Sequence, residues 1–198
     1  MLVVITSEKG SVSEKLDILQ MFDMGLKCLH VRKPGFSEEQ MKNWLAEYPP
    51  KYREKMVLHE YYHLAENFAL RGIHFTEKAK SDYAADLKEY SDSYRNKGFS
   101  VSASFHDPAK VDDLPNLDYV FLSPVFNSIS KKGYEGKGFM VNKLRSKVLA
   151  LGGITLENIK AVRSMGYCGV AFLGSVWQNA DPVENFKKIQ KAYHHEFR

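Results

Sequence analysis

The chain has 198 residues, of which 44% are hydrophobic and 26% are charged, and its formal net charge is +4. This composition is typical of a globular protein and excludes a disordered or fibrous chain. Lysines and arginines are spread along the sequence without a basic stripe of interleaved aromatic residues. We therefore expect no nucleic-acid partner, and the excess charge fits a few cations that bind a small anion.

Two cysteines, Cys28 and Cys168, share no metal-ligand spacing with each other or with the histidines. We expect both to be reduced, buried thiols in a cytoplasmic protein. No apolar segment approaches the length of a membrane span, and the first residues lack the pattern of a secretory signal. We therefore expect no membrane partner.

Short apolar segments rich in β-branched residues recur along the chain and predict buried strands. They are residues 2–6, 28–31, 56–58, 73–75, 100–104, 119–122, 148–151 and 170–173. Several show little alternation of apolar and polar residues, as expected for a parallel sheet that is covered on both faces.

Segments with helical periodicity separate these strands. They are residues 13–24, a helix that begins after Ser37, and residues 61–70, 82–96, 107–112, 155–165 and 183–193. Ser37, with Gln40 three residues later, predicts a capped helix start. Eight strand–helix alternations predict an α/β fold, a compact (β/α)8 TIM barrel that forms a single domain over residues 1–198. An open, doubly wound sheet is the alternative.

Functional residues of such barrels gather at the C-terminal ends of the strands. Here those ends carry many titratable residues, among them His59, His74 and His106. One histidine at a strand end is more often structural than catalytic, so the prediction rests on the group. The roles of His59 and His74 stay open.

Glycines follow the last two predicted strands. Gly152 and Gly153 follow the seventh, while Gly174 and Ser175 follow the eighth and lead into a possible short helix. Backbone N–H groups of such loops, with the start of a short helix, commonly bind phosphate in this fold. The alternative is that these glycines only form turns.

Several motifs together resemble the thiamine phosphate synthase and TenI-like thiazole tautomerase family nearly end to end. They are His30-Val31-Arg32, residues 65–74, Ser104-Phe105-His106, Asp118-Tyr119-Val120, Ser123-Pro124-Val125-Phe126, Gly152-Gly153-Ile154 and Gly174-Ser175. The resemblance implies one of two activities. The synthase joins a pyrimidine diphosphate to a thiazole phosphate and releases pyrophosphate with Mg²⁺, whereas the tautomerase rearranges a thiazole phosphate carboxylate to its aromatic form without metal or diphosphate.

Some positions depart from the synthase pattern. Where that pattern has an Asn-Asp pair, this chain has His59 and Glu60, and Ala79 falls where a further Asp is expected. Pro34 stands where the synthase has a lysine. Mg²⁺ usually holds substrate phosphates through one or two carboxylates, so Glu60 could serve but lacks a partner.

The loop after the sixth strand favours the tautomerase. Residues 131–138 resemble the tautomerase form of this loop, and His106 falls where that branch has its catalytic histidine. Ser128 and Ser130 replace two threonines of the synthase and keep their hydroxyls, so they do not discriminate.

We therefore expect first a thiazole tautomerase with His106 as general acid and base, because an imidazole can perform both steps near neutral pH. The expected substrate-binding residues are Arg32, Ser104, Ser128, Ser130, Lys131, Gly152, Gly153, Gly174 and Ser175. No cofactor is expected, or Mg²⁺ at Glu60 if the chain is a synthase. A synthase and a non-catalytic barrel that binds a phosphate ligand are the alternatives, and a homodimer is possible.

Overall fold

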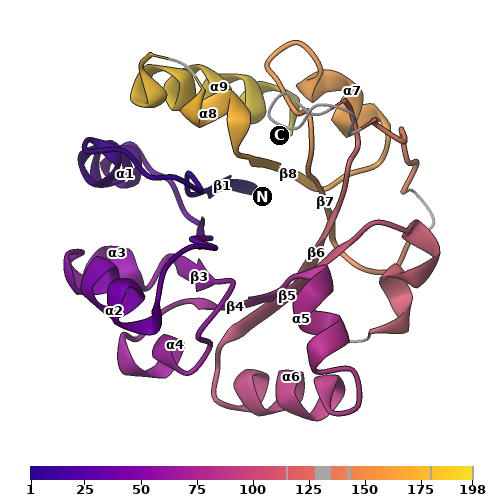
Figure 1. Ribbon diagram of the computed structural model, residues 1–198. Helices are drawn as coiled ribbons and strands as arrows, with labels where there is room; N and C mark the ends of the chain where they lie inside the picture. Colours follow the sequence, from indigo (N-terminus) through magenta and orange to yellow (C-terminus); the bar gives the residue numbers. More distant parts are fainter. Residues whose placement is uncertain (115, 128–134, 142–143, 179, 198) are drawn as a thin grey trace.

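The computed structural model describes residues 1–114, 116–127, 135–141, 144–178 and 180–197. Eight parallel strands close into a barrel in chain order, and β8 pairs with β1 (Figure 1). The strands are β1 (Leu2–Ile5), β2 (Leu29–Val31), β3 (Met56–Leu58), β4 (Gly72–Phe75), β5 (Ser100–Phe105), β6 (Tyr119–Leu122), β7 (Val148–Ala150) and β8 (Gly169–Phe172). The predicted TIM barrel is confirmed and the open sheet is excluded.

Helices surround the barrel on its outside. They are α1 (Glu14–Asp23), α2 (Glu38–Ala46), α3 (Pro50–Arg53), α4 (Leu64–Asn67), α5 (Glu77–Asp82), α6 (Leu87–Asn96), the 3₁₀ helix η1 (Pro108–Asp113), α7 (Ile159–Ser164), α8 (Gly174–Trp177) and α9 (Pro182–Glu196). The predicted cap of α2 is confirmed, because Ser37 Oγ accepts a hydrogen bond from the Gln40 N–H and Gln40 Oε1 accepts one from the Ser37 N–H.

The helix predicted for residues 82–96 is present as α6, but it begins at Leu87 and not at residue 82. Thr76 caps a separate short helix, α5, by accepting a hydrogen bond from the Ala79 N–H. A turn at residues 83–86 separates α5 from α6. This turn brings the rings of Tyr83 and Tyr90 into a stacked contact, with centroids 4.9 Å apart. The aromatic residues of this segment therefore pack on each other across the turn and not along one continuous helix.

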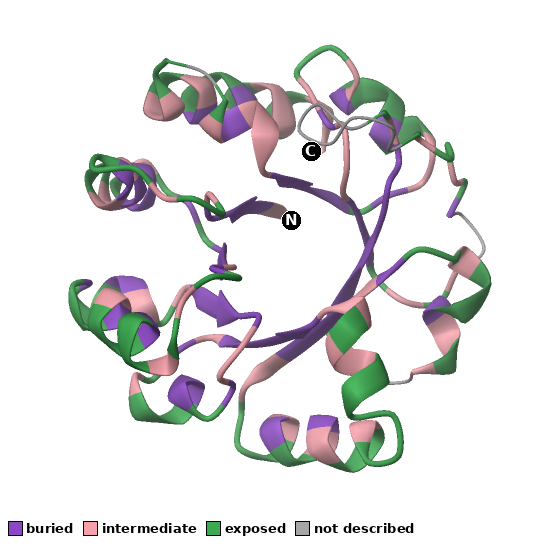
Figure 2. Cartoon of the chain, viewed as in Figure 1, coloured by how far each residue is buried: buried purple, intermediate pink, exposed green. Residues whose placement is uncertain are grey.

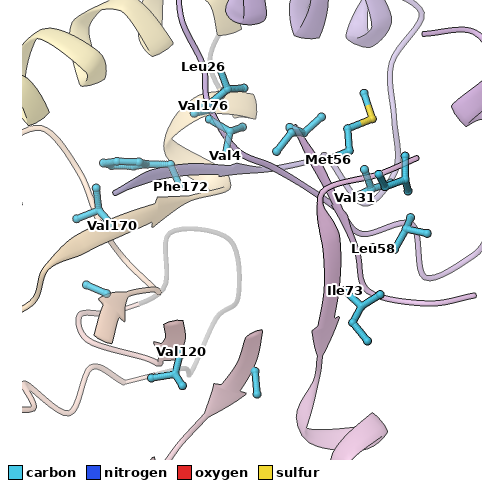
Figure 3. Close-up of a cluster of buried hydrophobic side chains, with 14 of the residues drawn as sticks. Val4, Leu26, Val31, Met56, Leu58, Ile73, Val120, Val170, Phe172 and Val176 are labelled. Carbon is cyan, nitrogen blue, oxygen red and sulfur yellow. The ribbon is translucent and has the colours of Figure 1, made fainter. Parts of the chain in front are cut away.

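Two layers of buried side chains alternate along each strand, as the period of two requires. Outward-facing residues pack under the helices, and Figure 3 shows Val4 and Phe172 from the sheet in this layer with Leu26 and Val176 from outside it. Inward-facing residues fill the barrel; the buried apolar ones are Val3, Ile5, Cys28, Val57, Tyr119, Phe121, Leu149 and Ala171. Figure 2 shows the result, with buried strands at the centre and exposed surfaces on the outer helices.

The two cysteines differ in their surroundings. Cys28 is buried inside the barrel, and burial raises the pKa of its thiol to about 11. Cys168 is exposed just before β8, so the expectation of two buried thiols is wrong for this residue. Within the described part of the chain, none of the helices combines the length and apolar character needed to cross a membrane.

Candidate functional site

A cavity of about 520 Å³ opens at the C-terminal ends of the strands. It is lined by ten residues that the sequence singled out: Arg32, Pro34, His59, Glu60, Ser104, His106, Gly152, Gly153, Gly174 and Ser175. Ala79 does not line it, and Ser128, Ser130 and Lys131 lie outside the described residues. A cavity of about 590 Å³ lies at the opposite end of the barrel, near Arg71 and Lys147. Since catalysis in this fold occurs at the C-terminal face, the first cavity is the candidate active site.

His106 lies at the rim of this cavity, directly after β5. Its Nδ1 atom is 2.8 Å from the backbone carbonyl oxygen of Ser123. Because a carbonyl only accepts, Nδ1 carries the hydrogen and the neutral ring has its lone pair on Nε2. The backbone N–H of His106 donates to Glu77 Oε1 over 3.2 Å. These contacts fix the tautomer of a histidine that could exchange protons with a ligand.

Arg32 and Lys33 follow β2 but have opposite surroundings. The Arg32 guanidinium lines the cavity and forms an ion pair with Glu8. Lys33 is almost completely buried, with its Nζ 2.5 Å from Glu14 Oε2 and 2.7 Å from the Ser7 carbonyl oxygen. The ammonium group of Lys33, the residue before Pro34, is therefore directed into the protein. Lys33 does not replace the lysine that the synthase pattern has at position 34.

The glycine pair after β7 has a structural role in addition to any ligand contact. Gly152 and Gly153 both have positive φ values, of 92° and 66°. A Cβ atom at Gly153 would lie 2.3 Å from the carbonyl oxygen of Asn127, so the absence of a side chain lets this loop pack against the loop after β6. A substitution at Gly153 would disturb this packing, whether or not a ligand binds there.

The short helix expected after β8 is present as α8, which begins at Gly174. Ser175 Oγ donates to the carbonyl oxygen of Ile154, which links the loops that follow β7 and β8. The two glycine-containing loops therefore form one continuous wall of the cavity.

Sequence reasoning missed three charged residues that line the cavity: Glu8, Glu77 and Lys78. Glu77 and Lys78 directly follow the Thr76 cap after β4, so their place after a strand was the available signal. Ala79, in the same helix, instead packs partly against the hydrophobic core. The carboxylate on this side of the cavity is thus supplied two residues before the position where the synthase pattern has it.

His59 and His74 differ in their exposure to the cavity. His74 is fully buried inside the barrel, with Nδ1 2.8 Å from Ser102 Oγ and Nε2 2.7 Å from Ser104 Oγ. Burial lowers its pKa to about 3, so the ring is neutral. His59 is also buried but lines the cavity, and burial lowers its pKa as well.

Comparison with known proteins agrees with this geometry. The family model described as thiamine monophosphate synthase matches residues 2–176. The chain belongs to the thiamine monophosphate synthase family. A family member named thiamine-phosphate synthase, from Caldivirga maquilingensis, is 27% identical over 96% of this chain and 94% of its own length.

Solved structures of other members have the same barrel. Thiamine phosphate pyrophosphorylase from Bacteroides thetaiotaomicron is 28% identical, with a TM-score of 0.74 over 100% of this chain and 99% of that one. The corresponding protein from Pyrococcus furiosus has a TM-score of 0.79 at 16% identity, covering 100% of this chain and 96% of that one, and supports the fold alone.

These relatives confirm the family resemblance and the expectation of an enzyme of the thiamine pathway. Their names support the synthase, which was the alternative, and give no support to the tautomerase that the loop after β6 favoured. The assignment of individual site residues stays a prediction.

Proposed function

We propose that this protein is a thiamine phosphate synthase, which joins a pyrimidine diphosphate to a thiazole phosphate and releases pyrophosphate. The observation that carries the proposal is the division of the cavity into two chemically different sides. Glu60 and Glu77 follow β3 and β4, whereas the glycine-containing loops follow β7 and β8. In a barrel with eight strands in sequential order, these pairs of strands lie on opposite sides.

The side with the carboxylates suits a magnesium-bound diphosphate. Mg²⁺ prefers oxygen ligands and is usually held by one or two carboxylates together with substrate phosphates. Glu60 and Glu77 both line the cavity, and Glu77 is the proposed partner that Glu60 lacks in the sequence pattern. Glu77 would thereby offset the loss at Ala79. When bound, Mg²⁺ would neutralise negative charge on the diphosphate.

The opposite side suits the phosphate of the thiazole. Backbone N–H groups of Gly153, Gly174 and Ser175 are the proposed donors, because main-chain donors in such loops bind anions without a mobile side chain. The predicted substrate-binding roles of Ser128, Ser130 and Lys131 concern residues outside the described part of the chain.

The reaction breaks the bond between the pyrimidine methylene carbon and a diphosphate oxygen, and the electron pair leaves with pyrophosphate. A new bond forms between that carbon and the thiazole nitrogen. Arg32 and Lys78 line the cavity and supply positive charge near the leaving group. Such charges are effective when they are positioned before charge develops in the transition state. The cavity walls hold the nitrogen and carbon in reach of each other.

A thiazole tautomerase is the second candidate, and the geometry of His106 favours it. Because Nδ1 donates its hydrogen to Ser123, the lone pair of the neutral ring lies on Nε2, and His106 lines the cavity. One ring could then remove a proton from the ring carbon that bears the carboxylate and return it to the exocyclic carbon.

Two assays on the purified wild-type protein separate these functions. Pyrophosphate release is measured with both synthase substrates, with Mg²⁺ or with a chelator. Aromatisation of the non-aromatic thiazole phosphate carboxylate is followed by ultraviolet absorbance under the same two conditions. The proposal requires magnesium-dependent pyrophosphate release. Chelator-resistant aromatisation without pyrophosphate release would replace it with the tautomerase.

A further inference from the structure

The interior of the barrel contains a cluster of three histidines, one from each of three adjacent strands or strand ends. His30 lies on β2, His59 directly follows β3, and His74 lies on β4. All three are buried, with 0%, 4% and 0% of their surface exposed. The interiors of such barrels are usually filled by branched apolar residues, so three imidazoles at the centre require an explanation.

The three rings contact one another directly. Their centroids lie 5.1 Å apart for His30 and His59, 5.0 Å for His30 and His74, and 4.3 Å for His59 and His74. One nitrogen from each ring can be chosen so that all three lie within 4.8 Å of one another. The group is thus a compact triangle of nitrogen atoms contributed by rigid strands and their ends.

Hydrogen bonds satisfy most of these nitrogens, but not all of them. His30 Nδ1 lies 2.9 Å from His59 Nε2, and His30 Nε2 lies 2.6 Å from the Tyr119 hydroxyl. Within the described residues, His59 Nδ1 is buried and has no hydrogen-bond partner. An unpaired buried polar atom costs about 1–3 kcal/mol. The described hydrogen bonds therefore leave this nitrogen of the cluster unsatisfied.

We propose that His30, His59 and His74 bind a divalent transition-metal ion of the zinc class inside the barrel. Three imidazoles and one open position are a common ligand set for Zn²⁺. Tetrahedral Zn²⁺ with bonds of about 2.0–2.1 Å requires nitrogens roughly 3.3 Å apart. The His30 Nδ1 and His59 Nε2 atoms, at 2.9 Å, need to separate by a few tenths of an ångström. The stacked rings of His59 and His74 need to rotate so that a nitrogen of each points at the ion.

The surroundings contain the partners that a metal-binding histidine needs. Such a histidine usually donates its second ring N–H to a fixed acceptor, which orients the ring. The Tyr119 hydroxyl can accept this hydrogen from His30, and a serine hydroxyl can accept it from His74. His74 must give up one of its two serine contacts. Ser104 is the contact to release, because it lines the cavity.

The cluster borders the cavity through His59, which lines it. This nitrogen site differs from the proposed oxygen site for Mg²⁺ at Glu60 and Glu77, and its test does not depend on synthase activity.

Metal binding is tested on the purified chain without a polyhistidine tag, after treatment with a chelator. Zn²⁺ is titrated by calorimetry, and Co²⁺ is added separately to record its visible absorption. We expect one ion per chain and the intense ligand-field absorption of tetrahedral Co²⁺. His59→Asn should weaken Zn²⁺ binding by about 100-fold or more, and Tyr119→Phe by about 10-fold, the scale for loss of an outer partner.

His63→Asn is the matched control, since His63 is exposed and lies outside the cluster. It should bind Zn²⁺ like the wild type, as should the double variant of the exposed His194 and His195. Circular dichroism verifies that each variant is folded. If His59→Asn does not fold, the Zn²⁺ affinity of Tyr119→Phe tests the proposal in its place. No stoichiometric binding by the wild type, or wild-type affinity in the folded cluster variants, would overturn the proposal. The three histidines would then be a neutral network that fills the barrel.

Discussion

The backbone carbonyl oxygen of Ser123 accepts a hydrogen bond from His106 Nδ1 over 2.8 Å, which sets the tautomer of a histidine at the rim of the cavity. The two candidate reactions use this histidine differently. Proton transfer by a general acid or base contributes about 10²–10⁴-fold to a rate, whereas the synthase reaction needs no proton shift between carbons.

His106→Asn should therefore keep kcat for pyrophosphate release within about tenfold of the wild-type value, because the synthase reaction does not need this residue to transfer a proton. Any aromatisation of the thiazole carboxylate should fall by about 100-fold or more. Measurement of kcat and KM for both reactions in this variant tests whether the two rates respond differently. If pyrophosphate release fell as steeply as aromatisation, His106 would have a catalytic role in the synthase that the present mechanism lacks.

The buried ion pair of Lys33 and Glu14 supports the loop that carries Arg32. Glu14→Gln leaves the Lys33 ammonium without its carboxylate in a dry environment, and breaking such a pair costs about 3–5 kcal/mol. Glu47→Gln, in the exposed pair with Lys15, should change stability by less than about 1 kcal/mol. Urea unfolding of both variants tests this difference. Equal stability of the two variants would show that the buried pair contributes no more to the free energy of unfolding than the exposed pair does.

Gly153→Ala should destabilise the protein by two effects. The residue has a φ of 66°, and the new Cβ would lie 2.3 Å from the Asn127 carbonyl oxygen. Gly98→Ala is the matched control, because Gly98 also has a positive φ, of 87°, but nothing lies within 4 Å of its Cβ position. The melting temperature of Gly153→Ala should be lower than that of Gly98→Ala. Gly98→Ala should lower the free energy of unfolding by about 1 kcal/mol, through the positive φ alone. Identical melting temperatures would mean that the loop adapts to the side chain.

Tyr167 gives an alkaline dependence of stability. Its hydroxyl is buried and has no hydrogen-bond partner within the described chain, and burial raises its pKa above the usual value of 10.0. The folded state then holds the phenolic proton where the unfolded state has lost it, so stability falls as pH rises above about 10. Tyr167→Phe should make this decline shallower and stabilise the protein slightly at neutral pH, as urea unfolding at a series of pH values would show. A steeper decline in the variant would contradict this reasoning.

The sequence predicted the barrel well because strand burial leaves a local signal. The residues of β3 and β6, for example, are continuous apolar segments that are too short for an ordinary helix. Helix starts with side-chain caps, such as Ser37, were also predictable. The boundary between α5 and α6 was not, because the turn at residues 83–86 contains neither glycine nor proline to mark it.

The candidate site was predicted as a set of strand ends, and the cavity brings ten of those residues together. What could not be predicted was their orientation. Lys33 and Arg32 are adjacent, yet one is buried against Glu14 and the other lines the cavity. The synthase pattern has a carboxylate where this chain has Ala79, whereas the first turn of α5 brings Glu77 to the cavity.

The most direct test of the central claim is the dependence of pyrophosphate release on Mg²⁺ concentration in Glu60→Gln. Glu39→Gln is the control, because Glu39 is exposed on α2 and does not line the cavity. Loss of one of two carboxylates from a metal-bound diphosphate site should raise the Mg²⁺ concentration for half-maximal rate and lower kcat by about 100-fold. Glu39→Gln should match the wild type. Unchanged magnesium dependence and rate in Glu60→Gln would contradict the proposed site.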